Sequence, residues 1–393
     1  HPEIFAAHYN ALAQNQVVRE SQSAYFPTME ADFTGSGADR NGRIGAGFLA
    51  TSRLFNREGQ GITIEQLITD SGRTPNLIAS SRFQARAANE NTQATRYDVL
   101  LAVDQAYFES LRDQALLKVA RGTISERQVV LDQVTAMVQN KLKSKLDLSF
   151  ANVSLAQAQL LEIQAENNVR ISFAQLTRAM GLQNTPSFTL VQEPLPPAPP
   201  ATGIGLVNQA MENRPELASL RFSRDSAYKF QRAERDLSYP TVAAVGVAGY
   251  IPAIEQLTST LIPNHYEAAG INVQIPIFNG HLFAARREAA LMKARQADEN
   301  LRNMEERIAR DVRVAWANAD TAYRRIDVAN ELLNQAQLAL ALAQGRYNLG
   351  LSSIVALSQA QLNETQAAIQ DVNAKYDYQE DNSALEYQMG MLR

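Results

Sequence analysis

One long helical pattern, over residues 281–347, limits what this chain can fold into. The stretch contains no Pro, and its only Gly is Gly345, near its end. Its apolar residues recur at alternating steps of three and four with one extra step of four, which is a heptad pattern with one phase shift. The recurring positions are Ala294, Ala297, Leu301, Met304, Ile308, Val312, Ala315, Ala319, Ala322, Ile326, Ala329, Leu333, Ala336, Leu340 and Ala343. At ~1.5 Å per residue the helix would be roughly 100 Å long, which no compact domain accommodates.

The composition excludes several classes of protein. The chain has 393 residues, a formal net charge of -4 and no cysteine. We therefore expect no disulfide, no thiolate metal site and no general attraction to nucleic acid. No run of about 18 apolar residues is present, so no membrane-spanning helix is predicted. The chain opens at His1 without Met, and we expect a mature or trimmed chain.

The sequence also contains an internal duplication. Pro2 and Pro27 recur as Pro215 and Pro240, both with an offset of 213 residues. Further pairs follow with offsets of 208 or 209: Gly72 with Gly280, Ala106 with Ala315, Leu142 with Leu351, Ala151 with Ala360, and Gly181 with Gly390. We predict two structural repeats, residues 1–192 and 205–393, with a stiff Pro-rich linker at 193–204 between them.

Both repeats show the same order of expected elements: short helix, two strands, long helix, turn and medium helix. The expected strands are 25–37, 60–70, 240–250 and 266–278. The expected helices are 1–24, 73–140, 150–181, 205–238, 281–348 and 352–390. A short and a medium helix together match one long helix in length, so we expect them to stack end to end. Gly181 and Gly390 would end the medium helices, and Pro2 and Pro215 would begin the short ones.

The strands alternate apolar and polar residues, although Gln66 and Leu67 interrupt the second. Four strands cannot close a barrel, and an open sheet leaves bare edges. An apolar strand face without a spanning helix suggests a membrane β-barrel that several chains complete. Aromatic residues near the strand ends fit the membrane interface or the caps of an ordinary soluble sheet. These are Tyr25, Phe26, Tyr239, Tyr250, Tyr266 and Phe278.

Short motifs in a fixed order run through both repeats. They are Pro2-Glu3, Leu146-Asp147-Leu148 with Ala151, Pro215-Glu216, Tyr239-Pro240, residues 276–280 (PIFNG) and residues 347–352 (YNLGLS). On these motifs the chain resembles the TolC-like outer-membrane efflux protein family. The resemblance implies a mostly α fold with β: a trimeric 12-stranded outer-membrane β-barrel, four strands per chain, continuous with a long periplasmic α-helical barrel. The linker would lie in the equatorial region of that helical barrel.

The resemblance also implies a function. The chain would be an outer-membrane exit duct of a tripartite efflux or type I secretion system, extending into the periplasm. It would act as a homotrimer in outer-membrane lipid with a periplasmic adaptor and an inner-membrane pump, and without nucleic acid. A soluble elongated coiled-coil scaffold is the alternative, which the duplicated apolar strands disfavour.

The resemblance places the functional site at two helix turns, residues 140–147 and 348–356. Tyr347 would reach Asp147 as a latch, and Ser352 stands where the family has an Arg. Ala356 and Gln359 match the positions of an acidic ring in the family, and neither is acidic. The predicted adaptor contacts are Lys141, Leu142, Lys143, Lys145, Gly350 and Leu351. The three lysines would bind an acidic adaptor surface or form a solvated loop.

No enzymatic chemistry is predicted. The four histidines, His1, His8, His265 and His281, are far apart and match no metal-ligand spacing. His281 is better explained as a helix start. No Ser-His-Asp arrangement is present. We therefore expect no catalytic residue, no metal and no cofactor.

Overall fold

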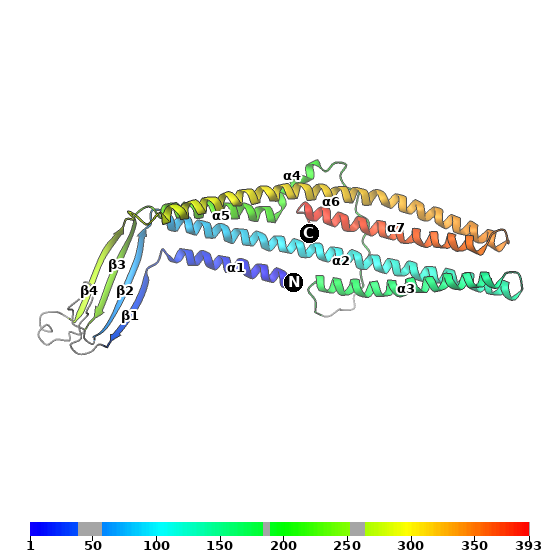
Figure 1. The fold of residues 1–393 in the computed structure, drawn as a ribbon, viewed down its shortest axis with the longest axis horizontal. Coiled ribbons are helices and arrows are strands. Elements are labelled where there is room, and N and C mark those ends of the chain that lie inside the picture. The colour runs from blue at the N-terminus through cyan, green and yellow to red at the C-terminus, as the bar shows by residue number, and fades with distance from the viewer. Residues whose placement is uncertain (38–56, 184–188, 252–263, 393) are drawn as a thin grey trace. The chain divides into compact units, whose positions relative to one another are not determined.

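The computed structural model describes residues 1–37, 57–183, 189–251 and 264–392 (Figure 1). The sequence also predicts loops that connect the strands of each pair, at residues 35–61 and 251–265, and most of both loops lies outside the described ranges. The helices are α1 (Pro2–Ser23), α2 (Arg73–Gln139), α3 (Lys145–Ala179), α4 (Ile204–Asn213), α5 (Pro215–Asp236), α6 (Leu282–Asn348) and α7 (Ile354–Gln388). The strands are β1 (Thr28–Ser36), β2 (Arg57–Thr69), β3 (Thr241–Tyr250) and β4 (His265–Gln274). Within the described residues, no helix is both long enough and apolar enough to cross a membrane.

The helices of the two predicted repeats have equal lengths. Both α2 and α6 have 67 residues, and both α3 and α7 have 35. Helices α1 and α5 have 22 residues each. The helix bounds align Ser71 with Gly280 and Gly72 with His281, and all four residues have positive φ. The expected pairing of Gly72 with Gly280 is therefore wrong by one residue, since Gly72 corresponds to His281. The expectation that His281 starts the long helix is also wrong, because α6 begins at Leu282.

Several expected boundaries are also wrong. The helix expected over 150–181 begins earlier, at Lys145, because Ser144 caps it. The helix expected over 205–238 divides at Arg214, whose extended conformation is the usual one before a proline. The last strand ends at Gln274 and not at 278, since its partner β3 begins at Thr241 and leaves nothing to pair with beyond Gln274.

The four strands form one antiparallel sheet in the order β1-β2-β3-β4. One face carries exposed apolar side chains: Met29, Phe33, Ile62, Ile64, Ile271 and Val273. The pairing register places Glu30, Asp32, Thr63 and Glu65 on the opposite face. The ladder shifts register between Leu67 and Thr69, so the interrupted alternation in the second strand corresponds to a bulge. Among the residues that the structure describes, β1 and β4 each leave one edge unpaired.

The structure divides into two compact units. The first unit comprises His1–His8, Glu90–Ala218 and Arg302–Arg393, and the second comprises Tyr9–Asn89 and Ser219–Leu301. The sheet belongs to the second unit, and the turns at the far ends of the long helices belong to the first. Each unit takes segments from both predicted repeats.

The heptad positions of α6 form its packed face. Ala294, Ile308, Val312 and Ala319 are fully buried, and the other heptad positions are buried or half-buried. In the first unit, a Cβ added at Gly181 would lie 3.2 Å from Pro2 Cδ, and one at Gly390 would lie 3.0 Å from the carbonyl oxygen of Asn213. The end of α3 therefore contacts the start of α1, and the end of α7 contacts the end of α4, just before the expected Pro215.

The Pro-rich segment before α4 is held by side chains from three helices. Tyr378 of α7 donates a hydrogen bond to the carbonyl of Pro197, and Trp316 Nε1 of α6 donates to the carbonyl of Pro200 at 2.9 Å. Tyr107 of α2 donates to the carbonyl of Val191. The segment has few N–H groups of its own, so these carbonyl bonds fix its path.

Candidate functional site

The two helix turns have the same backbone. Lys141 and Gly350 both have positive φ, 61° and 74°. At each turn the amides of two successive residues bond back to helix carbonyls: Lys141 N to Val138 O and Leu142 N to Met137 O, and Gly350 N to Tyr347 O and Leu351 N to Arg346 O. This is a Schellman ending, which normally places glycine at the residue with positive φ. Lys141 therefore occupies a glycine position.

The helices that leave the turns are capped by serines. Ser144 precedes α3, and Ser353 precedes α7. The Asp147 carboxylate accepts hydrogen bonds from the Ser144 hydroxyl at 2.6 Å and the Ser144 amide at 2.9 Å. The Ser144 hydroxyl, with desolvation opposing it, holds the pKa of Asp147 below its usual value. Ala356 takes the corresponding place on α7 and has no such side chain, so only the first turn has a capping box.

Tyr347 lies in the apolar core beside the turns. It is 2% exposed and packs with Val130, Val134, Ala151, Ile354 and Leu357. Its hydroxyl is buried and has no hydrogen-bond partner among the described residues. The Lys143 ammonium lies 4.2 Å from the centre of its ring. Burial and, secondarily, the charge of Asp147 raise the pKa of Tyr347.

The structure therefore brings Tyr347 near Asp147 but does not join them by a hydrogen bond. The Asp147 carboxylate is occupied by Ser144, and the latch stays a prediction. The Ser352 hydroxyl is also buried, and no described residue forms a hydrogen bond with it. Ala356 and Gln359 lie beyond the turn on α7 and are exposed, and Gln359 donates to Asn363 at 2.9 Å.

Most predicted adaptor contacts are accessible at the turns. Leu142 is 73% exposed and Leu351 is 66% exposed. Lys141, Lys145 and Gly350 are exposed as well. Lys143 differs, because it is half-buried over the Tyr347 ring. Their role in adaptor binding stays a prediction.

Sequence reasoning missed Ser144 and Arg127. Arg127 of α2 is 4% exposed and donates to the Gln361 carbonyl at 2.7 Å and to Thr365 Oγ1 at 2.9 Å. It lines a groove of about 500 Å³ between α3 and α7. The Ser144–Asp147 spacing is a capping-box signal that could have been read. Nothing in the local sequence marked Arg127 as buried.

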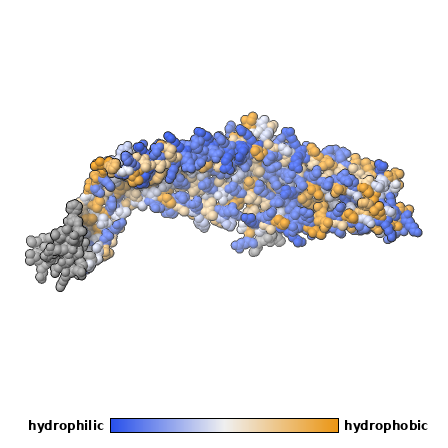
Figure 2. Space-filling model, in the orientation of Figure 1, coloured by the Kyte–Doolittle hydropathy of each residue, from blue (hydrophilic) through white to orange (hydrophobic). Residues whose placement is uncertain are grey.

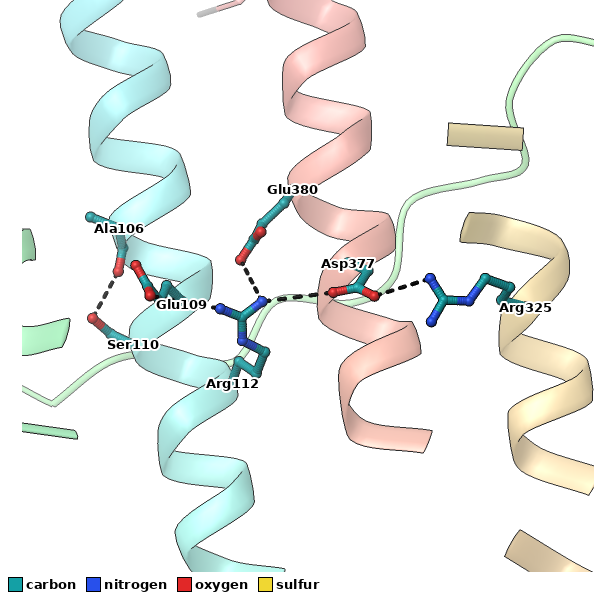
Figure 3. Close-up of polar contacts among 7 residues, drawn as sticks. All are labelled: Ala106, Glu109, Ser110, Arg112, Arg325, Asp377 and Glu380. Carbon is teal, nitrogen blue, oxygen red and sulfur yellow. Dashed lines mark hydrogen bonds and ion pairs between the residues drawn. The ribbon is translucent and has the colours of Figure 1, made fainter. Parts of the chain in front are cut away.

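A second polar cluster links three helices of the same unit (Figure 3). Arg112 of α2 lies 3.4 Å from Glu380 and 3.7 Å from Asp377, both on α7. Arg325 of α6 approaches the other oxygen of Asp377 at 3.3 Å. The chain of alternating charges thus runs from α2 through α7 to α6.

The carboxyl groups of this region are hard to ionise. Burial raises the pKa of Glu380 to about 7, although Arg112 opposes the shift. Burial, together with the charges of Glu193 and Glu386, raises the pKa of Asp104 to about 6. In the described part of the chain, no group of three or more His, Asp or Glu side chains is arranged to hold a metal.

Comparison with known families decides the class of protein. The family model described as "Outer membrane efflux protein" matches residues 1–182 and 206–391, which is nearly the whole chain. The chain belongs to the outer membrane efflux protein family. The match covers both repeats and leaves out much of the Pro-rich segment, which confirms the resemblance inferred from the motifs.

Individual relatives are distant in sequence and close in fold. The chain is 20% identical over 399 residues to outer membrane protein TolC of Salmonella enteritidis, covering all of this chain and 79% of that protein. It is 22% identical over 304 residues to TolC of Vibrio cholerae, covering 77% of this chain and 69% of that protein. The solved outer-membrane channel OprN superposes with a TM-score of 0.86 at 15% identity, over 99% of this chain and 87% of that chain.

Proposed function

We propose that this protein is a passive exit duct in the outer membrane, extending into the periplasm and serving an efflux or type I secretion system. Solutes would pass through a water-filled lumen, and an inner-membrane pump would supply the energy through a periplasmic adaptor. The family to which the chain belongs, with relatives named as outer membrane proteins, favours this function over a soluble scaffold.

The sheet is the observation that carries the proposal. Its strands have 9, 13, 10 and 10 residues, about the length that crosses a bilayer when tilted. One face carries the exposed apolar side chains named above, as a lipid-facing surface requires. Both outer edges lack a partner strand in the described part of the chain, and unpaired backbone groups are costly in lipid. Three copies that join β1 of one to β4 of the next would give a closed barrel of 12 strands.

Crosslinking tests this assembly, because the chain has no native cysteine. Ala31→Cys with Ala269→Cys places one thiol on each outer strand, on the same face of the sheet. We expect a short bifunctional maleimide to give products that end at the trimer. Products that extend beyond the trimer, or no intermolecular product, would refute a closed barrel.

The matched control uses the two central strands. Thr63 and Val247 are direct partners in the β2–β3 ladder. Thr63→Cys with Val247→Cys should crosslink within one chain and leave the electrophoretic mass unchanged. Intermolecular products from this pair would show that the reagent reports random collisions.

We further propose that the helix turns form the gate and bind the adaptor. Gating would change the hydrogen-bond donor to the Asp147 carboxylate. The donor is the Ser144 hydroxyl in the structure described above, and it would be the Tyr347 hydroxyl when the latch forms. The unpartnered Tyr347 hydroxyl supports this exchange, since a buried hydroxyl without a partner is costly. Lys141, Leu142, Lys145, Gly350 and Leu351 would contact the adaptor.

Single-channel recording tests the exchange. Tyr347→Phe removes the latch donor, so we expect a higher mean conductance. Ser144→Ala frees Asp147 for Tyr347, and we expect a lower mean conductance. Opposite shifts from the two variants would support the exchange, whereas unchanged conductance in both would exclude a gating role for this pair.

A further inference from the structure

The helices beside the sheet carry an excess of positive charge. Residues 9–23, 73–89, 219–236 and 282–301, the helical parts of the second unit, contain thirteen Lys or Arg and seven Asp or Glu. The whole chain has 37 basic and 41 acidic residues. The positive excess is therefore local to these helical segments. Figure 2 shows a strongly hydrophilic surface over α5 and the first half of α6.

Part of this charge is neutralised within the unit. Arg286 pairs with the buried Glu234 at 2.7 Å, and Arg235 pairs with Asp236 at 3.1 Å. Other basic side chains form no ion pair with any residue that the structure describes. We call six of these the unpaired basic residues; they are Arg82, Lys229, Arg232, Arg287, Lys293 and Arg295. All of them are exposed except Lys229, which is half-buried.

These residues begin within a few helical turns of the strands. Arg232 lies four residues before the end of α5, and Arg287 lies five residues after the start of α6. At ~1.5 Å per residue, both are within about 10 Å of a helix end that leads to a strand. The exposed aromatic residues Tyr239 and Phe278 lie between those helix ends and the strands. Aromatic residues in such places mark the level where hydrocarbon meets headgroups.

We propose that the unpaired basic residues bind the phosphate groups of anionic phospholipids in the leaflet that faces the helices. This inference rests on the proposed membrane position of the sheet. The apolar sheet face would fix the depth of the protein, and the basic side chains would extend along the helices toward the headgroups. Arg forms bidentate hydrogen bonds with phosphate, which suits it to this role.

Lipid selection by the purified full-length protein tests the proposal. The protein is equilibrated with mixed micelles of phosphatidylglycerol and phosphatidylcholine, and the ratio of the two lipids that stay bound is compared with the bulk ratio. Each basic residue near an anionic surface raises the affinity for that surface by about tenfold or less. We expect wild-type protein to enrich phosphatidylglycerol, and Lys229→Gln/Arg232→Gln/Arg287→Gln to lose most of that enrichment.

A matched triple variant controls for net charge. Arg307, Arg313 and Arg346 are exposed residues of α6 in the other unit, and none forms an ion pair with another described residue. Arg307→Gln/Arg313→Gln/Arg346→Gln should retain the wild-type enrichment. An equal loss in both triple variants, or no enrichment by the wild type, would overturn the proposal.

Two further measurements separate the possible failures. If inorganic phosphate alone displaces the phosphatidylglycerol completely, the site binds free anions and the lipid assignment is wrong. Planar-bilayer recordings of the same preparation test the duct itself. Protein that inserts and conducts without enriching phosphatidylglycerol contradicts only this inference, whereas protein that never inserts contradicts the proposed function.

Discussion

At the scale of single residues, the two helix turns share one backbone but not one residue type. Gly350 adopts positive φ without a steric penalty, whereas Lys141 adopts it at a cost of about 1 kcal/mol or more. A lysine at this position suggests that its exposed side chain has a use at the turn, which is consistent with the predicted adaptor contact.

Lys141→Gly should therefore stabilise the protein by roughly 1 kcal/mol against thermal or chemical unfolding. Lys141→Ala removes the same charge and keeps the strained φ, so it is the matched control and should give little gain. Equal stabilisation by both substitutions would assign the effect to the lysine charge and not to the backbone.

Within the sheet, Tyr266 lies over two glycines on the polar face. A Cβ added at Gly249 would clash with the Tyr266 hydroxyl and approach the Gln60 carbonyl oxygen to 2.6 Å, and one at Gly61 would meet the same hydroxyl at 2.5 Å. The close backbone contact leaves no room for a larger residue. We expect Gly249→Val to reduce the yield of folded, heat-resistant oligomer on gels.

Gly246 of the same strand provides the control for this prediction. A Cβ there would meet no atom of the described residues within 4 Å. Gly246→Val should leave the oligomer yield near the wild-type level. If Gly249→Val and Gly246→Val give the same oligomer yield, the effect comes from placing valine in this strand and not from the contact with Tyr266.

At the scale of elements, the sequence predicted which helices and strands exist better than where they end. The apolar heptad pattern of α6 repeats over many helical turns, so a few polar residues within it do not prevent the helix from being predicted. An end depends instead on a few local contacts, such as the Ser144 cap that starts α3 five residues early. The end of β4 at Gln274 is set by where its partner strand β3 begins, and the alternation of residues within β4 does not reveal that position.

The link between α2 and α7 gives an element-scale prediction about pH. The pKa of Glu380 is about 7 in the folded protein, against 4.5 for an ordinary glutamate. A raised pKa means that ionisation disfavours the folded state, so this group lowers stability as pH rises from about 4.5 to 7. Glu380→Gln should remove that penalty and raise the melting temperature at pH 8 more than at pH 5.

Glu109→Gln is the control for this experiment. Glu109 contacts the same Arg112 at 3.7 Å, but its side chain is 41% exposed. We expect this variant to follow the wild-type pH profile. A Glu380→Gln profile that stays parallel to the wild type between pH 5 and pH 8 would contradict the assigned penalty.

At the scale of the whole molecule, family membership could be inferred from ordered motifs, but the details of the site could not. The proximity of Tyr347 to Asp147 was carried over from the resemblance, and the structure supports that proximity. The partner that Asp147 actually has, Ser144, is three residues away and forms a purely local contact. The burial of Arg127 against α7 joins residues more than 230 positions apart, and no single-sequence pattern reports such a contact.

The matched helix lengths constrain how this family member can change in evolution. Helices α2 and α6 have the same length, and so do α3 and α7. An insertion that lengthens one pair of helices, α2 with α3 or α6 with α7, would therefore displace the turn of that pair from the turn of the other pair. Growth of the chain would then require coordinated additions in all four helices, in whole heptads so that each packed face keeps its orientation. A change of helix length in one predicted repeat would therefore have to be matched in the other.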